Sequence, residues 1–468
     1  MKSSRYFLIA LAAFNFLFMS CNSKSSEEKN NFTGAEGEVK IIELQPGHFH
    51  SALVLKEAHP QIHEQVHVYA SEGPELNSFL ELINTYNTRD DDPTQWETDV
   101  YKGDDYLEKA LQEKKGNVMV TAGNNARKTD YILQFVEQGI NVLADKPMVI
   151  SPDKFDQLLR AFEIAEENGV LLYDIMTERS EINTILQKKL AHEASVFGSF
   201  VPGTPEEPTI SKESVHHFFK YVSGSPLVRP AWFFDVEQQG EGIVDVTTHL
   251  VDLVQWQLFP GQIIDYKNDI EMLDAERWPT LLSSDQFERV TQLSEYPDYL
   301  DQYIENDTLE VFANGAMNYQ INGLHAHVSV VWDFEAPEGA GDTHYSVIRG
   351  TKSDLIIRQG EEENYRPVLY VKLKDDSDPV LFEQDLNQII TEDFNDEYPG
   401  LTLEKQEEDF WMIGVPDQYR IGHEAHFGEV MERYLQYLVD GKLPEWEVPN
   451  MIAKYYTNMQ ALEMAKRK

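Results

Sequence analysis

The chain has 468 residues, with 39 Lys and Arg against 81 Asp and Glu, a formal net charge of −42 and a hydrophobic share of 41%. This length exceeds what one hydrophobic core usually covers, so it predicts two or three domains. The apolar and aromatic content excludes a fully disordered chain. An acidic surface repels phosphate groups, so nucleic acid is excluded as an expected partner.

The first residues predict a compartment. A short basic start precedes an apolar run over residues 6–19, which has the length of a signal peptide rather than of a membrane span. Cys21 is the only cysteine and stands where a lipoprotein signal is cut and lipidated. We therefore predict a lipoprotein signal over 1–21, a polar tether over 22–37, and a lipid-anchored protein in the envelope of a Gram-negative type of bacterium, facing the periplasm or the outside. An ordinary signal peptide or an uncleaved anchor is the alternative.

The first half of the chain alternates short apolar strands with amphipathic helices. This alternation predicts parallel βαβ units in a doubly wound, Rossmann-type α/β sheet over residues 38–176. Such a sheet binds ligands at the carboxyl ends of its strands. The expected strands are 39–44, 66–70, 118–122, 141–144 and 170–175, and the expected helices are 51–58, one containing 131–136, and 152–168.

The second half changes character. Short segments with period-two alternation and Gly, Asp and Asn turns predict an α+β domain with a mostly antiparallel open sheet over residues 177–420. Within it we expect one clear helix over 244–258 and a polar surface insertion over 265–306. Helices are expected again over residues 421–468.

Two motifs resemble a known family. Residues 139–147 read Gly-Ile-Asn-Val-Leu-Ala-Asp-Lys-Pro, a strand that ends in an acidic residue before Lys-Pro. Trp232 and Asp235 then precede a glycine cluster, followed by Asp245, His249 and Asp252. Together they resemble the Gfo/Idh/MocA oxidoreductases, which include glucose-fructose oxidoreductase and inositol dehydrogenase. The resemblance covers roughly residues 39–258, with a more divergent sheet beyond.

The second motif also has a physical interpretation. Asp245, His249 and Asp252 are spaced four and three apart, so on a helix they share one face. A carboxylate one turn before a His can orient its ring, and a His that titrates near neutrality suits the removal of a hydroxyl proton. Lys146, at the end of a parallel strand, would project into the crevice, where a nicotinamide cation could lower its pKa. The resemblance implies the same catalytic set: Lys146, Asp245 and His249. The alternative is a structural helix with a satisfied core His and a surface Lys.

The resemblance further implies a tightly bound NAD or NADP and a sugar or glycoside substrate. The family's Gly-x-Gly-x-x-Gly turn is reduced to Gly47 alone, which either re-routes cofactor contacts or marks a lost cofactor. Expected cofactor contacts are Gly47, His48, Phe49, Glu72, Ala122, Gly123, Asn124, Asp145 and Lys146. Expected substrate contacts are Arg179, Trp232, Asp245 and His249.

Histidines that are two residues apart could bind a metal. His48 with His50, or His325 with His327, would share one face if they lay in strands. Scattered histidines are the commoner explanation in a protein of this size, so we expect no metal.

These features predict one function and two alternatives. An enzyme outside the cytoplasm has no free NAD pool, so its dinucleotide would remain bound and be recharged by a second carbonyl or electron acceptor. We expect hydride transfer between this cofactor and a ring hydroxyl of a sugar or glycoside, with C3 favoured, giving a keto-sugar. The first alternative is an NAD-assisted glycosidase that uses transient oxidation and elimination. The second is a non-catalytic sugar-binding lipoprotein. A homo-oligomer is left open.

Overall fold

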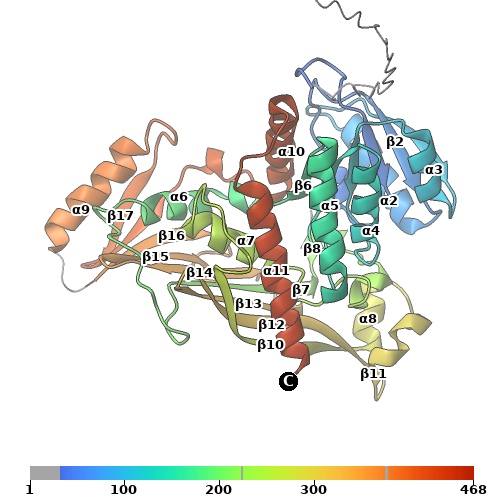
Figure 1. The fold of residues 1–468 in the computed structure, drawn as a ribbon. Coiled ribbons are helices and arrows are strands. Elements are labelled where there is room, and N and C mark those ends of the chain that lie inside the picture. The colour runs from blue at the N-terminus through green and yellow to red at the C-terminus, as the bar shows by residue number, and fades with distance from the viewer. Residues whose placement is uncertain (1–31, 223–224, 375–377) are drawn as a thin grey trace, which may run out of the picture.

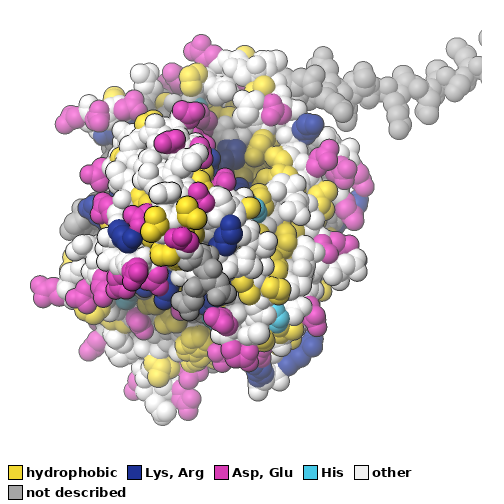
Figure 2. All heavy atoms as spheres, turned by 90° about the vertical axis from the view of Figure 1, so that its left-hand side faces the viewer, with side chains coloured by type: hydrophobic (Ala, Val, Ile, Leu, Met, Phe, Trp, Pro, Cys, Tyr) yellow, Lys and Arg dark blue, Asp and Glu magenta, His cyan; other side chains and the backbone are white. Residues whose placement is uncertain are grey.

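The computed structural model describes residues 32–222, 225–374 and 378–468 (Figure 1). The predicted signal over 1–21, with Cys21, lies outside the described residues, as does most of the tether. Within the described ranges, no helix combines the length and the apolar character that crossing a membrane requires. Acidic side chains are spread over the face shown in Figure 2 rather than gathered in one patch.

The first domain confirms the predicted doubly wound sheet. Six strands, all parallel, lie in the order β3-β2-β1-β4-β5-β6. Both central strands β1 and β4 are buried along their whole length, which explains their continuous apolar runs. The strands are β1 (Ile41–Leu44), β2 (Gln65–Ala70), β3 (Glu97–Lys102), β4 (Val118–Thr121), β5 (Asn141–Asp145) and β6 (Leu172–Ile175).

Helices cover both faces of this sheet, and two elements differ from the expectation. The helix expected over 51–58 is a single turn, α1 (His50–Leu53). The unpredicted β3 is an edge strand with no fully buried residue, so it lacks an apolar run to reveal it. The other helices are α2 (Pro74–Thr88), α3 (Tyr106–Glu113), α4 (Lys128–Glu137) and α5 (Phe155–Asn168).

The second domain contains the predicted open, mostly antiparallel sheet. Its order is β10-β12-β13-β7-β14-β15-β16-β18-β17, and only β7 and β13 pair in parallel. The strands are β7 (Ile210–Phe219), β10 (Ile270–Ser283), β12 (Thr308–Ile321), β13 (Leu324–Glu335), β14 (Thr343–Arg349), β15 (Ser353–Gln359), β16 (Val368–Leu373), β17 (Thr402–Glu407) and β18 (Phe410–Gly414). Short pieces are β8 (Tyr221–Val222), β9 (Ser225–Pro226) and β11 (Ile304–Glu305).

The expectation that residues 265–306 form a surface insertion is wrong. This segment supplies the long edge strand β10, which pairs with β12, and helix α8 (Ser284–Thr291). Two register shifts interrupt the pairing, between Met272 and Asp274 and between Trp278 and Thr280. These irregularities break the period-two pattern, and most side chains of this edge strand are partly solvated, so the sequence conceals it.

The C-terminal helices join the two domains. Helix α11 (Glu447–Lys466) runs past both domains (Figure 1) and packs against α5, α7 and β10. Helix α10 (His423–Asp440) packs against α1, β6 and the short 3₁₀ helix η2 (Thr177–Ser180). The remaining helices are α6 (Ile182–Ala191), α7 (Thr247–Leu258) and α9 (Pro379–Gln388). This packing holds the carboxyl ends of the Rossmann strands against the open sheet.

Candidate active site

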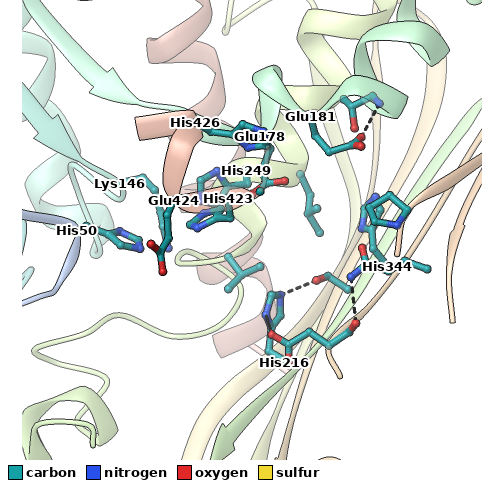
Figure 3. Close-up of a pocket in the computed structure, with 18 of the residues that line it drawn as sticks. His50, Lys146, Glu178, Glu181, His216, His249, His344, His423, Glu424 and His426 are labelled. Atoms are coloured by element: carbon teal, nitrogen blue, oxygen red, sulfur yellow. Dashed lines mark hydrogen bonds and ion pairs between the residues drawn. The ribbon is translucent and has the colours of Figure 1, made fainter. Parts of the chain in front are cut away.

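A cavity of about 940 Å³ lies where the carboxyl ends of β4 and β5 meet the open sheet. Its walls come from the turn after β1, from η2, from the start of α7, and from β7, β14 and the start of α10. Figure 3 shows His50 and Lys146 on one side of the cavity and His216 and His344 on strands opposite. The crevice expected at the carboxyl ends of the strands therefore lies between the two domains.

Lys146 and Asp245 form an ion pair in the cavity wall. Lys146 Nζ lies 2.6 Å from Asp245 Oδ1, and the two side chains are only 10% and 8% exposed. Gln239 Nε2 donates to the other oxygen of Asp245 at 3.0 Å. Burial lowers the pKa of Lys146, but the carboxylates of Asp245 and Asp145 raise it by more, so the pKa is raised overall. The protein itself therefore keeps Lys146 charged, and the lowered pKa expected from the sequence would require a bound cation.

His249 lines the same cavity as this ion pair. Its buried Nδ1 has no hydrogen-bond partner among the described residues. Burial, followed by the charge of Lys146, holds the pKa of His249 well below its usual value, so the ring is neutral at pH 7. The structure thus brings together Lys146, Asp245 and His249, which are 99 and 4 residues apart in the chain.

The expected contact from Asp245 to the His249 ring is wrong. Helix α7 begins at Thr247, so Asp245 lies in the preceding turn and is directed at Lys146 instead. Asp252 does lie on α7, but it faces away from the cavity.

Arg179 belongs to a buried ion network rather than to the cavity wall. Its guanidinium donates two hydrogen bonds to Asp252, both at 2.7 Å, and a third to Glu447, also at 2.7 Å. Lys454 Nζ lies 2.9 Å from Asp252 and 2.7 Å from Asp174. Burial raises the pKa of Asp252, but Arg179 and Lys454 outweigh it and hold the pKa well below its usual range. The predicted substrate contact from Arg179 is therefore corrected to a structural role.

The turn after β1 is folded onto the end of β4. The backbone amides of Gly47 and His48 both donate to the carbonyl of Ala122, at 3.0 and 3.1 Å. A Cβ placed on Gly123 would come within 2.9 Å of the Gly47 nitrogen, so the two turns touch through their backbones. In dinucleotide-binding Rossmann folds, such turn amides face a diphosphate. Here these two amides are already paired within the protein.

The side chains of this turn also differ from those of a glycine-rich phosphate-binding turn. Gln45 takes the place of the first glycine at a φ of 47°, and its Oε1 accepts a hydrogen bond from the Ser71 nitrogen at the end of β2. His50 takes the place of the third glycine, and α1 after it has only four residues. The ordinary phosphate-binding turn is therefore absent at this position.

The other predicted contact residues divide into two groups. His48, Phe49, Gly123, Asp145 and Lys146 line the cavity. Glu72 is exposed beyond the end of β2, Ala122 and Asn124 lie in the β4 turn, and Trp232 packs beside Gly47; none of these four lines the cavity. Asn124 donates to Gln238 at 2.6 Å, which ties this turn to the second domain.

Sequence reasoning missed much of the cavity wall. Further lining residues include His216, His344, His423 and His426, together with Glu178, Glu181 and Trp332. The His216 ring stacks on Trp332 with centroids 5.0 Å apart, and Arg229 lies over the same indole at 5.2 Å. Trp332 is only 7% exposed and also stacks on Phe218, so its indole packs the wall of the cavity. The alternation within β7 could have indicated that His216 faces the same side as Ser214.

Comparison with known proteins gives the family. The family model described as "Putative oxidoreductase C terminal domain" matches residues 186–466, which is more than half of the chain. The chain belongs to this oxidoreductase family. No curated protein matches it.

Solved structures agree with this family. A putative oxidoreductase from Parabacteroides merdae ATCC 43184 is 55% identical, with a TM-score of 0.92 over 93% of this chain and 99% of the other. Levoglucosan dehydrogenase in complex with NADH and levoglucosan is 12% identical, with a TM-score of 0.59 over 92% and 97% of the two chains. GenD2 from gentamicin A biosynthesis, in complex with NAD, is 16% identical, with a TM-score of 0.53 over 92% and 94%. The last two show a shared fold.

Proposed function

We propose that this oxidoreductase transfers hydride between a nicotinamide dinucleotide and a ring hydroxyl of a sugar or glycoside, with C3 favoured, giving a keto-sugar. The observation that carries the proposal is the buried Lys146–Asp245 ion pair, 2.6 Å long, in one cavity with a neutral His249. Proteins of the same fold support it, because levoglucosan dehydrogenase has been solved with NADH and levoglucosan and with NADH and L-sorbose.

The nicotinamide end of the cofactor fits this cavity better than the diphosphate does. Gly123, Asn125 and Lys146 stand together in the cavity wall, at or just beyond the carboxyl ends of β4 and β5. The buried Oδ1 of Asn125, like Nδ1 of His249, has no partner among the described residues, so a polar group of a ligand would satisfy them. Because the amides of Gly47 and His48 already donate to the carbonyl of Ala122, other groups would hold the diphosphate.

The cavity residues have distinct roles in this proposal. When bound, the dinucleotide supplies the hydride acceptor. His249, neutral at pH 7, takes the hydroxyl proton on a ring nitrogen. Lys146 stays charged and donates a hydrogen bond to the same oxygen, which stabilises negative charge developing there. Asp245 fixes the position of Lys146 Nζ.

The remaining details are also part of the proposal. The cofactor remains bound through turnover, and a second carbonyl or electron acceptor takes the hydride back. The lipid anchor at Cys21 and the envelope location are supported by the sequence of residues 1–21.

One observation favours a second candidate. The two turn amides that would face a diphosphate are bonded to Ala122, as they would be in a protein that kept the fold but lost the cofactor. The second candidate is therefore a sugar-binding protein without redox activity.

Cofactor release separates the two candidates. The purified protein is denatured without added cofactor, and released NAD or NADP is measured by absorbance and mass. About one equivalent, or binding on titration to the native protein, supports the redox enzyme. The sugar-binding candidate would be favoured if no dinucleotide is released and none binds on titration, while the same protein still binds a glycoside.

A further inference from the structure

The turn after β1 brings three metal-binding side chains together. His48, His50 and Asp145 each offer one ligand atom, and these atoms lie within 4.8 Å of one another. His50 Nδ1 is 3.0 Å from Asp145 Oδ2, and the rings of His48 and His50 meet edge to face with centroids 4.0 Å apart. Small side-chain rotations would close this spacing to that around a metal with bonds of about 2 Å.

Asp145 supplies the carboxylate of this group. It is 5% exposed, and among the described residues the only side chain within ion-pair distance of its carboxylate is His50. The neighbouring amines are committed elsewhere, since Lys146 pairs with Asp245 and Lys128 Nζ donates to the backbone carbonyl of Asp145. A bound metal would place a positive charge in direct contact with this buried carboxylate.

The two imidazoles are held in place by their neighbours. The backbone nitrogen of His50 donates a hydrogen bond to His48 Nδ1 at 3.3 Å. The ring of Phe427 packs against His50 at 4.6 Å and restricts its movement.

We propose that His48, His50 and Asp145 bind a divalent transition-metal ion, such as Zn²⁺ or Fe²⁺. Two imidazoles and one carboxylate are a ligand set that both ions accept, with further coordination positions left open. All three residues line the cavity, so the open positions face the space where a ligand oxygen or water would lie. This proposal departs from the sequence-based expectation of no metal, and it does not rest on the proposed hydride transfer.

Metal content tests the proposal without any assay of activity. The protein is purified with a tag that contains no histidine, freed of metal with a chelator, and titrated with Zn²⁺ by calorimetry. We expect one equivalent to bind, with an accompanying rise in Tm. His50→Ala and Asp145→Asn should each weaken binding at least about a hundredfold, since loss of a second-shell partner alone costs 10–100-fold.

A matched control uses a second pair of histidines that are two residues apart. His325 and His327 on β13 are hydrogen-bonded to Gln320 and Asn318, so His325→Ala should bind Zn²⁺ like the wild type. Circular dichroism of each variant shows whether it folds, and Asp145→Asn preserves shape where His50→Ala does not. Absence of stoichiometric Zn²⁺ binding in the wild type, or unchanged binding in folded Asp145→Asn, would overturn the proposal.

Discussion

Two aspartates, one just before α7 and one on it, form ion pairs that have different roles. Asp245 lies just before α7 and pairs with Lys146 in the cavity wall, while Asp252, seven residues later, pairs with Arg179 in the core. The first pair touches the space where a ligand would bind. The second ties η2 to α7 and, through Glu447 and Lys454, to α11. The same motif therefore supplies Asp245 and His249 to the site, and Asp252 to the packing between the domains.

Breaking the core pair should have the largest effect. Asp252→Ala leaves the buried charges of Arg179 and Lys454 without their carboxylate, so we expect the free energy of unfolding to fall by about 3–5 kcal/mol. Urea denaturation of the variant and the wild type measures this difference. A loss below about 1 kcal/mol would contradict the structural role of this pair.

The same pair should make stability depend on acid pH. The pKa of Asp252 is lowered in the folded protein, so its contribution is fully present above the unfolded value of about 3.9 and is lost as pH falls through the folded pKa. Asp252→Asn should weaken this acid dependence. Thermal melting from pH 7 down to about pH 3 provides the measurement, and identical profiles for both proteins would argue against the assignment.

Breaking the cavity pair should affect turnover instead. Lys146→Ala should lower turnover at least about a hundredfold, equivalent to about 2.7 kcal/mol, with the fold retained, because the reacting oxygen loses its charged donor. Initial rates with the best glycoside from a screen provide the measurement. Lys154→Ala serves as the control, since the half-buried Lys154 pairs with Asp130 outside the cavity. Equal rates in both variants would remove Lys146 from the mechanism.

The contact between the β1 and β4 turns should tolerate no side chain. In Gly123→Ala the new methyl group would meet the Gln45 carbonyl at 2.8 Å, so we expect a loss of about 1–3 kcal/mol in the free energy of unfolding. Ala126→Gly, which changes an exposed residue of the same turn, is the control. Gly139→Ala is unsuitable because Gly139 has a positive φ. Wild-type stability of Gly123→Ala would show that the two turns separate readily.

The pH profile of turnover should show an unusually low acid limb. The neutral ring of His249 is the proposed base, and its pKa is lowered, so kcat/KM should stay level as pH falls through 6.5 and decline only well below it. His249→Asn should lose this limb along with most activity. An acid limb centred at 6.5 or above would assign the base to another group.

The smallest effect is expected at Glu72. This exposed residue lies beyond the end of β2 and outside the cavity, so Glu72→Ala should leave dinucleotide affinity unchanged within about twofold. Fluorescence titration of both proteins with NAD provides the comparison. A tenfold weaker affinity would restore the cofactor role predicted from the sequence.

The sequence predicted the sheets well because buried strands carry continuous or alternating apolar residues. The strands β1, β2, β4, β5 and β6 all follow such runs, whereas β3 and β10 are solvated edge strands without them. The site was only partly predictable. Lys146, Asp245 and His249 stood in recognisable motifs, but the contacts of Asp245 and Arg179 depend on which neighbours the fold presents. The cavity histidines come from strands and helices far apart in the chain, and no local spacing joins His50, His216 and His423.

In the proposed function, the cavity around Lys146 is a dinucleotide-dependent redox site. Its most direct test adds glycosides in turn to the purified protein, supplied with NAD or NADP, and follows the absorbance of reduced nicotinamide within a single turnover. We expect at least one glycoside to produce this signal in the wild type, and Lys146→Ala to slow it about a hundredfold or more. Sugar binding without any reduced nicotinamide, with either dinucleotide, would contradict it.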